Sequence, residues 1–140
     1  MVTMDLNKLE LNEFIAKANP GQRCKATFPM FGALGTKDSA MVYVELDPGE
    51  ELGTHTDSAE EILLVLDGKI EATVDKENTE ASVGGLVLVP KMVPHNFRNI
   101  GNTTAKVLGF FGGANNIVAT FENVWSPTES NMVDTSAITV

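Results

Sequence analysis

The sequence predicts an all-β fold of the barrel or jelly-roll type, built as one domain. From residue 23 onward, short segments rich in Val, Ile, Leu and Phe recur between Gly, Pro and Asp turns, the pattern of a chain of short antiparallel strands. No repeat of fixed period and no low-complexity linker interrupts that pattern. At 140 residues, the chain is long enough to bury a core without disulfide staples.

The first segment has a different character. Apolar residues between Leu6 and Ala18 follow an imperfect helical period that ends before Asn19-Pro20-Gly21, which predicts a short amphipathic helical arm. We therefore divide the chain into an N-terminal arm (1–22), a β-barrel (23–125) and a C-terminal tail (126–140). The Ser, Thr and Asn content of the tail favours flexibility, although its apolar end, 137–140, could add a strand to a neighbouring subunit.

We expect a series of short strands between the N-terminal arm and the C-terminal tail. They cover residues 25–31, 39–46, 61–66, 70–74, 86–89, 105–111 and 117–121, with a further strand that carries His95 and Phe97. The dipeptide Asp67-Gly68 separates two of them and is favoured in tight hairpins, because glycine accepts a positive φ at no steric cost. The sequence thus predicts a hairpin at this dipeptide.

The chain has only two histidines, His55 and His95, and both lie in stretches that also supply carboxylates, glycines and prolines. His55 and Asp57 are two residues apart, so in an extended strand their side chains project from the same face. Glu61 could close the group from the next strand, and His95 could add the second imidazole. Nitrogen and oxygen donors without thiolate suit one divalent transition metal such as Mn, Fe, Ni or Zn. The residues predict a metal site of catalytic type.

These stretches resemble the two motifs of the cupin superfamily. The first motif places Gly, His-x-His, Glu and Gly at fixed spacing, and the chain keeps that spacing with Gly49, His55, Glu61 and Gly68. The second motif places Gly, Pro-x-Gly, His and Asn, and it is matched by Gly84, Pro90, His95 and Asn99. The chain departs from the pattern twice, with Asp57 at the usual second histidine and Met92 at the usual glycine of the second motif.

The resemblance implies a double-stranded β-helix, or jelly-roll barrel, of a small single-domain cupin (monocupin) similar to the quercetin-dioxygenase-like, type 2 cupins. It also implies a homodimer. Asp57 leaves two arrangements of the metal site open. In one, all four residues are ligands, and Asp57 makes the site more anionic. In the other, His55, His95 and one carboxylate form a facial triad, which would free Asp57 to act as a base or to support a ligand without touching the metal. Asp57 and Glu61 are thus the candidate catalytic residues.

Two classes of function follow. In the first, the protein is a metal-dependent enzyme that acts on a small oxygen-rich organic molecule, as a dioxygenase or as an isomerase, cyclase or lyase. In the alternative, it binds a small molecule or a metal without turnover, as a sensor or a storage module. By strand alternation Phe97 shares the face of His95, and Leu63 shares that of Glu61. With Tyr43, these residues are predicted to line the substrate pocket.

Composition limits the binding partners and the cellular compartment that we expect for this protein. Ten basic residues against nineteen acidic ones give a net charge of −9, which opposes binding to nucleic acid or to an anionic membrane. Cys24 is the only cysteine, so no intrachain disulfide can form, as is usual in a reducing compartment. The N-terminus lacks the basic and apolar regions of a secretory signal. We therefore expect a cytoplasmic protein with a small-molecule substrate.

Overall fold

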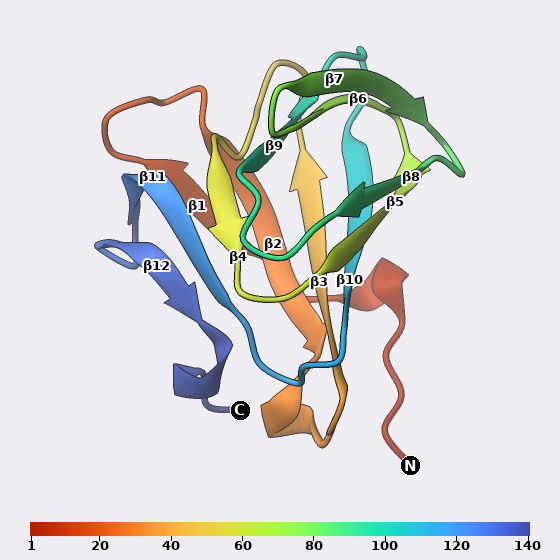
Figure 1. Cartoon of the computed structure of the whole chain (residues 1–140), viewed down its shortest axis with the longest axis vertical. Coiled ribbons are helices and arrows are strands. Elements are labelled where there is room, and N and C mark those ends of the chain that lie inside the picture. The colour runs from red at the N-terminus through yellow and green to blue at the C-terminus, as the bar shows by residue number, and fades with distance from the viewer.

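The computed structural model describes all 140 residues and is almost entirely made of strands (Figure 1). The strands are β1 (Asn12–Ala16), β2 (Arg23–Met30), β3 (Ser39–Leu46), β4 (His55–Asp57), β5 (Glu61–Asp67), β6 (Lys69–Val74), β7 (Glu77–Ser82), β8 (Leu86–Val89), β9 (His95–Asn99), β10 (Ala105–Gly112), β11 (Val118–Ser126) and β12 (Ser130–Asp134). Three short 3-10 helices are η1 (Leu6–Lys8), η2 (Gly32–Leu34) and η3 (Thr135–Ala137). The prediction of an all-β jelly-roll barrel is confirmed.

The strands form one hydrogen-bonded path that curls into a nearly closed barrel (Figure 1). Its order is β7-β6-β9-β4-β11-β1-β2-β3-β10-β5-β8, and β12 pairs with β11. Two residue pairs join β11 to β1, and we divide the path at this junction into two walls. We call β7-β6-β9-β4-β11 with β12 the β9 wall, and β1-β2-β3-β10-β5-β8 the β10 wall.

Inward-facing residues of both walls form the hydrophobic core of the barrel. A cluster of fifteen buried residues includes Leu46, Leu63 and Phe97, and a second cluster of six includes Phe31 and Phe111. Alternation along the strands places these side chains on the inner face, because neighbouring residues of a strand point to opposite sides. The four residues of the predicted metal site are buried in the same interior.

The prediction of a helical arm over Leu6 to Ala18 is wrong beyond Lys8. Only η1 is helical, and Asn12–Ala16 forms β1, which pairs with β2 and β11. The apolar period in this segment was imperfect, and pairing with strands distant in sequence outweighs a weak local helical preference. None of the helices in the structure has the length and apolar character needed to cross a membrane.

Part of the C-terminal segment adds a strand to its own barrel, while the pairing of residues 137–140 with a neighbouring subunit stays a prediction. Ser130–Asp134 forms β12 on β11, and Thr135 is fully buried behind it. The Thr135 hydroxyl accepts the backbone N–H of Ile117 at 2.9 Å and donates to Asn116 Oδ1 at 2.8 Å. The polar residues that favoured a flexible tail thus include one that fastens it to the barrel. The domain boundaries 1–22, 23–125 and 126–140 stay predictions.

The predicted hairpin at Asp67-Gly68 is also wrong. β5 and β6 follow each other in the chain, but β5 pairs with β8 and β10, whereas β6 pairs with β7 and β9. Gly68 does have a positive φ of 78°, so glycine is needed there. The turn carries the chain from one wall to the other and does not close a hairpin.

Candidate metal centre

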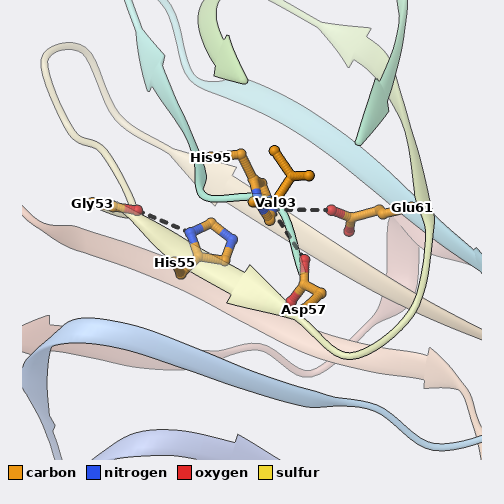
Figure 2. Close-up of polar contacts among 6 residues, drawn as sticks. All are labelled: Gly53, His55, Asp57, Glu61, Val93 and His95. Carbon is orange, nitrogen blue, oxygen red and sulfur yellow. Dashed lines mark hydrogen bonds and ion pairs between the residues drawn. The ribbon is translucent and has the colours of Figure 1, made fainter. Parts of the chain in front are cut away.

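β4 and β9 bring the two histidines together in the barrel interior. His55 and His95 are direct register partners, and their ring centroids are 4.0 Å apart. Phe121 of β11 stacks on His55 with a centroid distance of 4.7 Å. Asp57 is buried on the same strand as His55, as alternation predicts for residues two apart. Glu61 reaches the same region from the start of β5 (Figure 2).

Backbone carbonyls set the orientation of both imidazole rings. His55 Nδ1 lies 2.9 Å from the Gly53 carbonyl oxygen, and His95 Nδ1 lies 2.9 Å from that of Val93 (Figure 2). A carbonyl oxygen can only accept, so each Nδ1 carries a hydrogen and donates it. In the neutral ring Nε2 then has a free lone pair. Histidine ligands of metals are commonly oriented by such bonds.

Three polar atoms meet in this interior without hydrogen bonds. His95 Nε2 lies at ion-pair distance from both carboxylates, 3.0 Å from Asp57 Oδ2 and 3.5 Å from Glu61 Oε1, but none of the three buried atoms makes a hydrogen bond. Buried polar atoms are normally paired, because an unpaired one loses its hydration without compensation. A cation between these atoms would satisfy all three, so the donor set fits a divalent metal.

The cluster that could hold the metal contains one carboxylate. His55, Asp57 and His95 each offer a ligand atom, and these atoms lie within 4.8 Å of one another. Glu61 lies outside this group, although its Oε1 is close to His95. The structure therefore brings together all four predicted residues but groups Asp57, rather than Glu61, with the histidines. This arrangement favours Asp57 as a ligand over Asp57 as a separate base.

Burial and mutual charge shift the pKa values of these groups in opposite directions. Burial, followed by the charge of His95, lowers the pKa of His55 to about 4. Burial raises the pKa of Glu61 to about 7, although the hydrogen-bonding influence of His95 opposes this rise. Burial also opposes the charging of His95, but the carboxylates of Asp57 and Glu61 outweigh it and raise that pKa to about 10. In the metal-free protein, the Nε2 atom of His95 therefore carries a proton at the position where a metal would bind.

Gly109 makes room for the Glu61 carboxylate. A Cβ atom built on Gly109 of β10 would overlap Glu61 Oε2 and would lie 2.8 Å from Val42 Cγ1. A glycine inside a strand often marks such a close approach. Gly109 is a residue that our sequence reasoning missed, although a glycine within the apolar run of residues 107–111 was a usable signal.

Gly53 has a similar role behind His55. Its φ is 76°, and a Cβ atom there would lie 2.6 Å from the Gln22 side chain. Gln22 is buried and donates to Glu122 Oε1 at 2.9 Å. Glycine is therefore required both by the backbone conformation and by the packing of Gln22. The Gly53 carbonyl, which orients His55, is held in place by this local geometry.

A backbone hydrogen bond also connects the segments that carry the two motifs. The Met92 N–H donates to the Asp57 carbonyl oxygen at 2.9 Å. Met92 has a φ of 62°, in the left-handed region that favours glycine. The chain thus carries a side chain in a backbone conformation that favours glycine, at the position where the family motif has glycine. That side chain is 56% exposed and does not line the cavity described next.

A large cavity of about 910 Å³ opens from the candidate metal centre. His55, Asp57 and Glu61 form its polar part, and twenty-one of its thirty-two lining residues are hydrophobic. The aromatic lining consists of Phe14, Phe28, Phe31, Phe97, Phe111, Phe121 and Trp125. No lysine or arginine lines it. The cavity therefore offers an apolar chamber with an acidic and imidazole-containing centre.

Of the three residues predicted to contact a substrate, only Phe97 lines this cavity. Leu63 faces inward, as predicted, but it lies among the residues of the larger hydrophobic cluster. Tyr43 lies on the opposite face of β3 from the cavity residues Val42 and Val44, and its hydroxyl donates to Glu45 Oε2 at 2.7 Å. The cavity thus gives no support to a substrate contact at Leu63 or Tyr43. Cys24 is buried in the wall, and burial raises the pKa of its thiol to about 12.

Comparison with known proteins identifies the family. The cupin domain model matches residues 42–111, half of the chain, and the span contains all four residues of the candidate metal centre. The chain belongs to the cupin family, and its residues form one cupin barrel. An uncharacterised protein from Methanocaldococcus jannaschii is 37% identical over 51 residues, which are 36% of this chain and 41% of that protein.

Solved structures of similar fold include proteins with several different activities. A candidate sugar phosphate isomerase from Acidithiobacillus ferrooxidans is 21% identical, with a TM-score of 0.68, over 100% of this chain and 95% of that one. The polyketide cyclase RemF from Streptomyces resistomycificus is 17% identical, with a TM-score of 0.65, over 80% and 79%. The oxalate decarboxylase of Lactobacillus farciminis is 19% identical, with a TM-score of 0.66, over 79% of this chain and 32% of its own. At these identities the likeness shows the fold.

Proposed function

We propose that this protein is a metal-dependent enzyme whose substrate is a neutral, largely apolar organic molecule that carries oxygen donors. The observation that supports it best is the buried cluster of Asp57, Glu61 and His95 at the polar end of an aromatic cavity, where the facing atoms lie at ion-pair distance but make no hydrogen bonds. His55, Asp57 and His95 would hold a divalent transition metal (Mn, Fe, Ni or Zn), because their donors suit that group. Such a metal would polarise a substrate oxygen or, if redox-active, support oxidation by dioxygen.

Glu61 is the proposed proton-handling residue. Its carboxylate faces the centre from the other wall, and it lies outside the group of three ligands. Gly109 leaves the Glu61 carboxylate space beside the cavity. A carboxylate in this position can take a proton from a bound substrate or return one to it, which is the general acid or base role. Isomerisation, cyclisation and lyase reactions all need such a group, as do some oxidations.

The cavity also limits the charge of the substrate. The names of two structural relatives refer to oxalate and to a sugar phosphate, which are anionic. In this chain the cavity has no lysine or arginine to pair with an anion, and its charged lining residues include Glu10 and Asp134. Apart from the proposed metal itself, an anion would find no cationic partner there to replace its lost hydration. We therefore expect neutral molecules with aromatic or aliphatic bodies.

Elemental analysis of untagged protein tests the metal. We expect close to one divalent transition metal per chain in the wild type and loss of that metal in His95→Ala. Asn96→Ala is the matched control, because Asn96 follows His95 on β9 but points to the outer face. No metal in the wild type, even after reconstitution with Mn, Fe, Ni or Zn, would leave the alternative of a metal-free binding module.

Thermal shift of the metal-loaded protein tests the substrate class. 2-Naphthol serves as the neutral aromatic probe, and oxalate and glucose 6-phosphate serve as the anionic ones. We expect 2-naphthol to raise the melting temperature by several degrees at about 100 times its dissociation constant, because a ligand specific to the folded state adds about 2.7 kcal/mol there. A larger shift with either anion would contradict the proposed substrate class.

A further inference from the structure

The peptide unit between Gly53 and Thr54 makes a hydrogen bond at each of its two polar groups. Its carbonyl oxygen accepts the Nδ1–H of His55 at 2.9 Å (Figure 2). Its N–H donates to Oε1 of Glu122, a residue of β11, at 3.3 Å. The C=O and N–H groups of a trans peptide point in opposite directions. A single chain of hydrogen bonds therefore runs from the Glu122 carboxylate through this peptide to His55.

A charge at one end of such a chain strengthens the hydrogen bonds along it. A carboxylate binds the peptide N–H more strongly than a neutral acceptor does, and this polarises the peptide, so that its carbonyl oxygen becomes a better acceptor. The carbonyl then binds the Nδ1–H of His55 more tightly, which makes the other ring nitrogen, Nε2, a stronger donor to a metal. The Glu122 carboxylate thus acts, through the peptide, on the atom of His55 that has the free lone pair.

A buried amide holds the Glu122 carboxylate in position. Gln22 is only 3% exposed, and its Nε2 donates to the same Oε1 atom of Glu122 at 2.9 Å. The Gln22 Oε1 atom accepts the side-chain N–H of Asn123 at 2.8 Å, and the Gln22 side chain occupies the space that a Cβ atom on Gly53 would take. The backbone N–H of Glu122 also donates to the Thr54 carbonyl oxygen at 3.1 Å. Both the backbone and the side chain of Glu122 are therefore fixed against Thr54.

The second imidazole of the centre has no equivalent chain. The Nδ1–H of His95 donates to the carbonyl oxygen of Val93 at 2.9 Å, and the residue after Val93 is Pro94. Proline has no backbone N–H, so the Val93–Pro94 peptide cannot receive a carboxylate at its other end. The carboxylates near His95 instead lie beside its Nε2 atom. The two histidines are therefore supported differently, although each donates to the carbonyl two residues before it.

We propose that Glu122 is a positioning residue of the metal centre, which acts on His55 through the Gly53–Thr54 peptide and is itself held by Gln22. This inference rests on the proposed function, because it concerns how strongly His55 would hold a metal. Metal-binding histidines often donate their second ring N–H directly to a carboxylate, whereas here one peptide unit stands between the two groups. Gln22 and Glu122 both lie outside residues 42–111, which the family model matches.

NMR of the histidine Nδ1–H groups in the metal-free protein tests the chain of hydrogen bonds. The sequence has only two histidines, and both are buried, so their ring N–H protons are protected from exchange, and His95→Ala assigns them. Glu122→Ala is expected to move the His55 signal to lower proton chemical shift, because its hydrogen bond weakens, while the His95 signal stays as the internal control.

Glu122→Gln separates the charge from the contact. Glutamine keeps an oxygen acceptor for the Thr54 N–H but carries no charge, so we expect a smaller shift of the His55 signal in the same direction. A residue that only fixed the backbone of this turn would give no shift in this variant, and that result would overturn the proposal. A His55 signal that moves no more than the His95 signal in Glu122→Ala would also overturn it.

Competition with a chelator for Zn²⁺ tests the consequence for metal binding. Glu122→Ala is expected to weaken Zn²⁺ binding about tenfold, at the lower end of the range for groups that orient metal ligands, because Glu122 is exposed to solvent and its charge is screened. Glu60→Ala is the matched control. Glu60 is also exposed and adjoins Glu61, so this variant removes a negative charge near the centre without touching the Gly53–Thr54 peptide.

The two ways in which this experiment can fail are distinct. A wild type that binds no Zn²⁺ would contradict the proposed function, and the inference would fall with it. A wild type that binds Zn²⁺ with an affinity that Glu122→Ala lowers no more than Glu60→Ala would overturn the inference alone. Circular dichroism of each variant checks that the barrel is folded.

Discussion

The two walls of the barrel use their inner and outer faces differently. The β9 wall carries His55, Asp57 and His95 inside and a polar, solvated face outside. The β10 wall contributes Glu61 and the space provided by Gly109 inside, and it exposes apolar side chains such as Leu86 and Leu88 outside. Backbone carbonyls of segments that precede β4 and β9 orient the two imidazoles. One wall thus fixes the ligand atoms, while the other wall supplies the remaining carboxylate and the volume around it.

The prediction with the largest expected effect concerns metal affinity as a function of pH, which depends on His95 of the β9 wall and on Glu61 of the β10 wall. A metal can bind His95 Nε2 only after the proton has left, and the pKa of His95 is raised from 6.5 to about 10. Metal affinity should therefore rise about tenfold per pH unit between about pH 7 and pH 10, because one proton is released on binding. Competition titrations of Zn²⁺ against a chelator of known affinity, at several pH values, measure this slope.

The metal-free protein should respond to pH with the opposite sign. A group whose folded pKa is raised stabilises the fold below its unfolded pKa and loses that contribution as pH rises through the folded value. His95 should therefore stabilise the metal-free protein at pH 6 and cease to do so near pH 10. Glu61→Gln removes one of the two carboxylates that raise the pKa of His95, so in this variant the rise in affinity should end at a lower pH. An affinity that does not change with pH would contradict the assignment of His95 as a ligand.

The sequence was sufficient where the information is local. His55 and Asp57 lie two apart on one strand, and their convergence follows from alternation alone. The strand Ser39–Leu46 was predicted with its bounds, because apolar residues dominate it and turn residues follow it. The inward direction of Phe97 also follows from the position of His95. In each case neighbours along the chain determine the result.

The sequence alone did not predict the elements whose structure depends on pairing between strands that are distant in the chain. β7 was missed because Glu77–Ser82 is polar, and it is a strand because β6 pairs with it. β1 was read as helical because its partners β2 and β11 cannot be seen in a local window. The space that Gly109 leaves for Glu61 depends on the register of β10 against β5. No spacing rule within one motif contains that register.

A second prediction tests the contribution of the β10 wall to the centre. Gly109→Ala should destabilise the protein by about 1 to 3 kcal/mol, because the added methyl group overpacks a filled interior. Gly112→Ala is the matched control on the same strand, since its Cβ atom would make only an ordinary contact of 3.5 Å with the Phe110 ring. Chemical denaturation measures both changes in the free energy of unfolding.

The double variant Gly109→Ala/Glu61→Ala tests whether the loss of stability in Gly109→Ala arises from the overlap with Glu61 or from the contact with Val42. Removing the Glu61 carboxylate vacates the space that the new methyl group would occupy. The two substitutions should therefore be non-additive, with the double variant more stable than the sum of the single effects predicts. Additive effects would show that Gly109 is required for the contact with Val42 instead of Glu61.

The smallest expected effect concerns the junction between the two motifs on the β9 wall. Met92→Gly should leave stability unchanged or raise it by up to about 1.6 kcal/mol. Glycine relieves the left-handed backbone at a φ of 62°, which costs a residue with a side chain about 1 to 2 kcal/mol, while the greater freedom of glycine in the unfolded chain offsets about 0.4 to 1 kcal/mol of that gain. The exposed Met92 side chain contributes little packing that could be lost.

Met132→Gly is the control with the opposite expected sign. Met132 is also largely exposed, but it lies within β12 in extended backbone, where glycine costs about 0.5 to 1 kcal/mol. Denaturation curves of the two variants therefore distinguish backbone strain from a general effect of glycine. If Met92→Gly destabilised the protein as much as Met132→Gly does, the Met92 side chain would have to stabilise this turn by a contact. In that case the departure from the family's glycine would be a functional substitution and not a tolerated one.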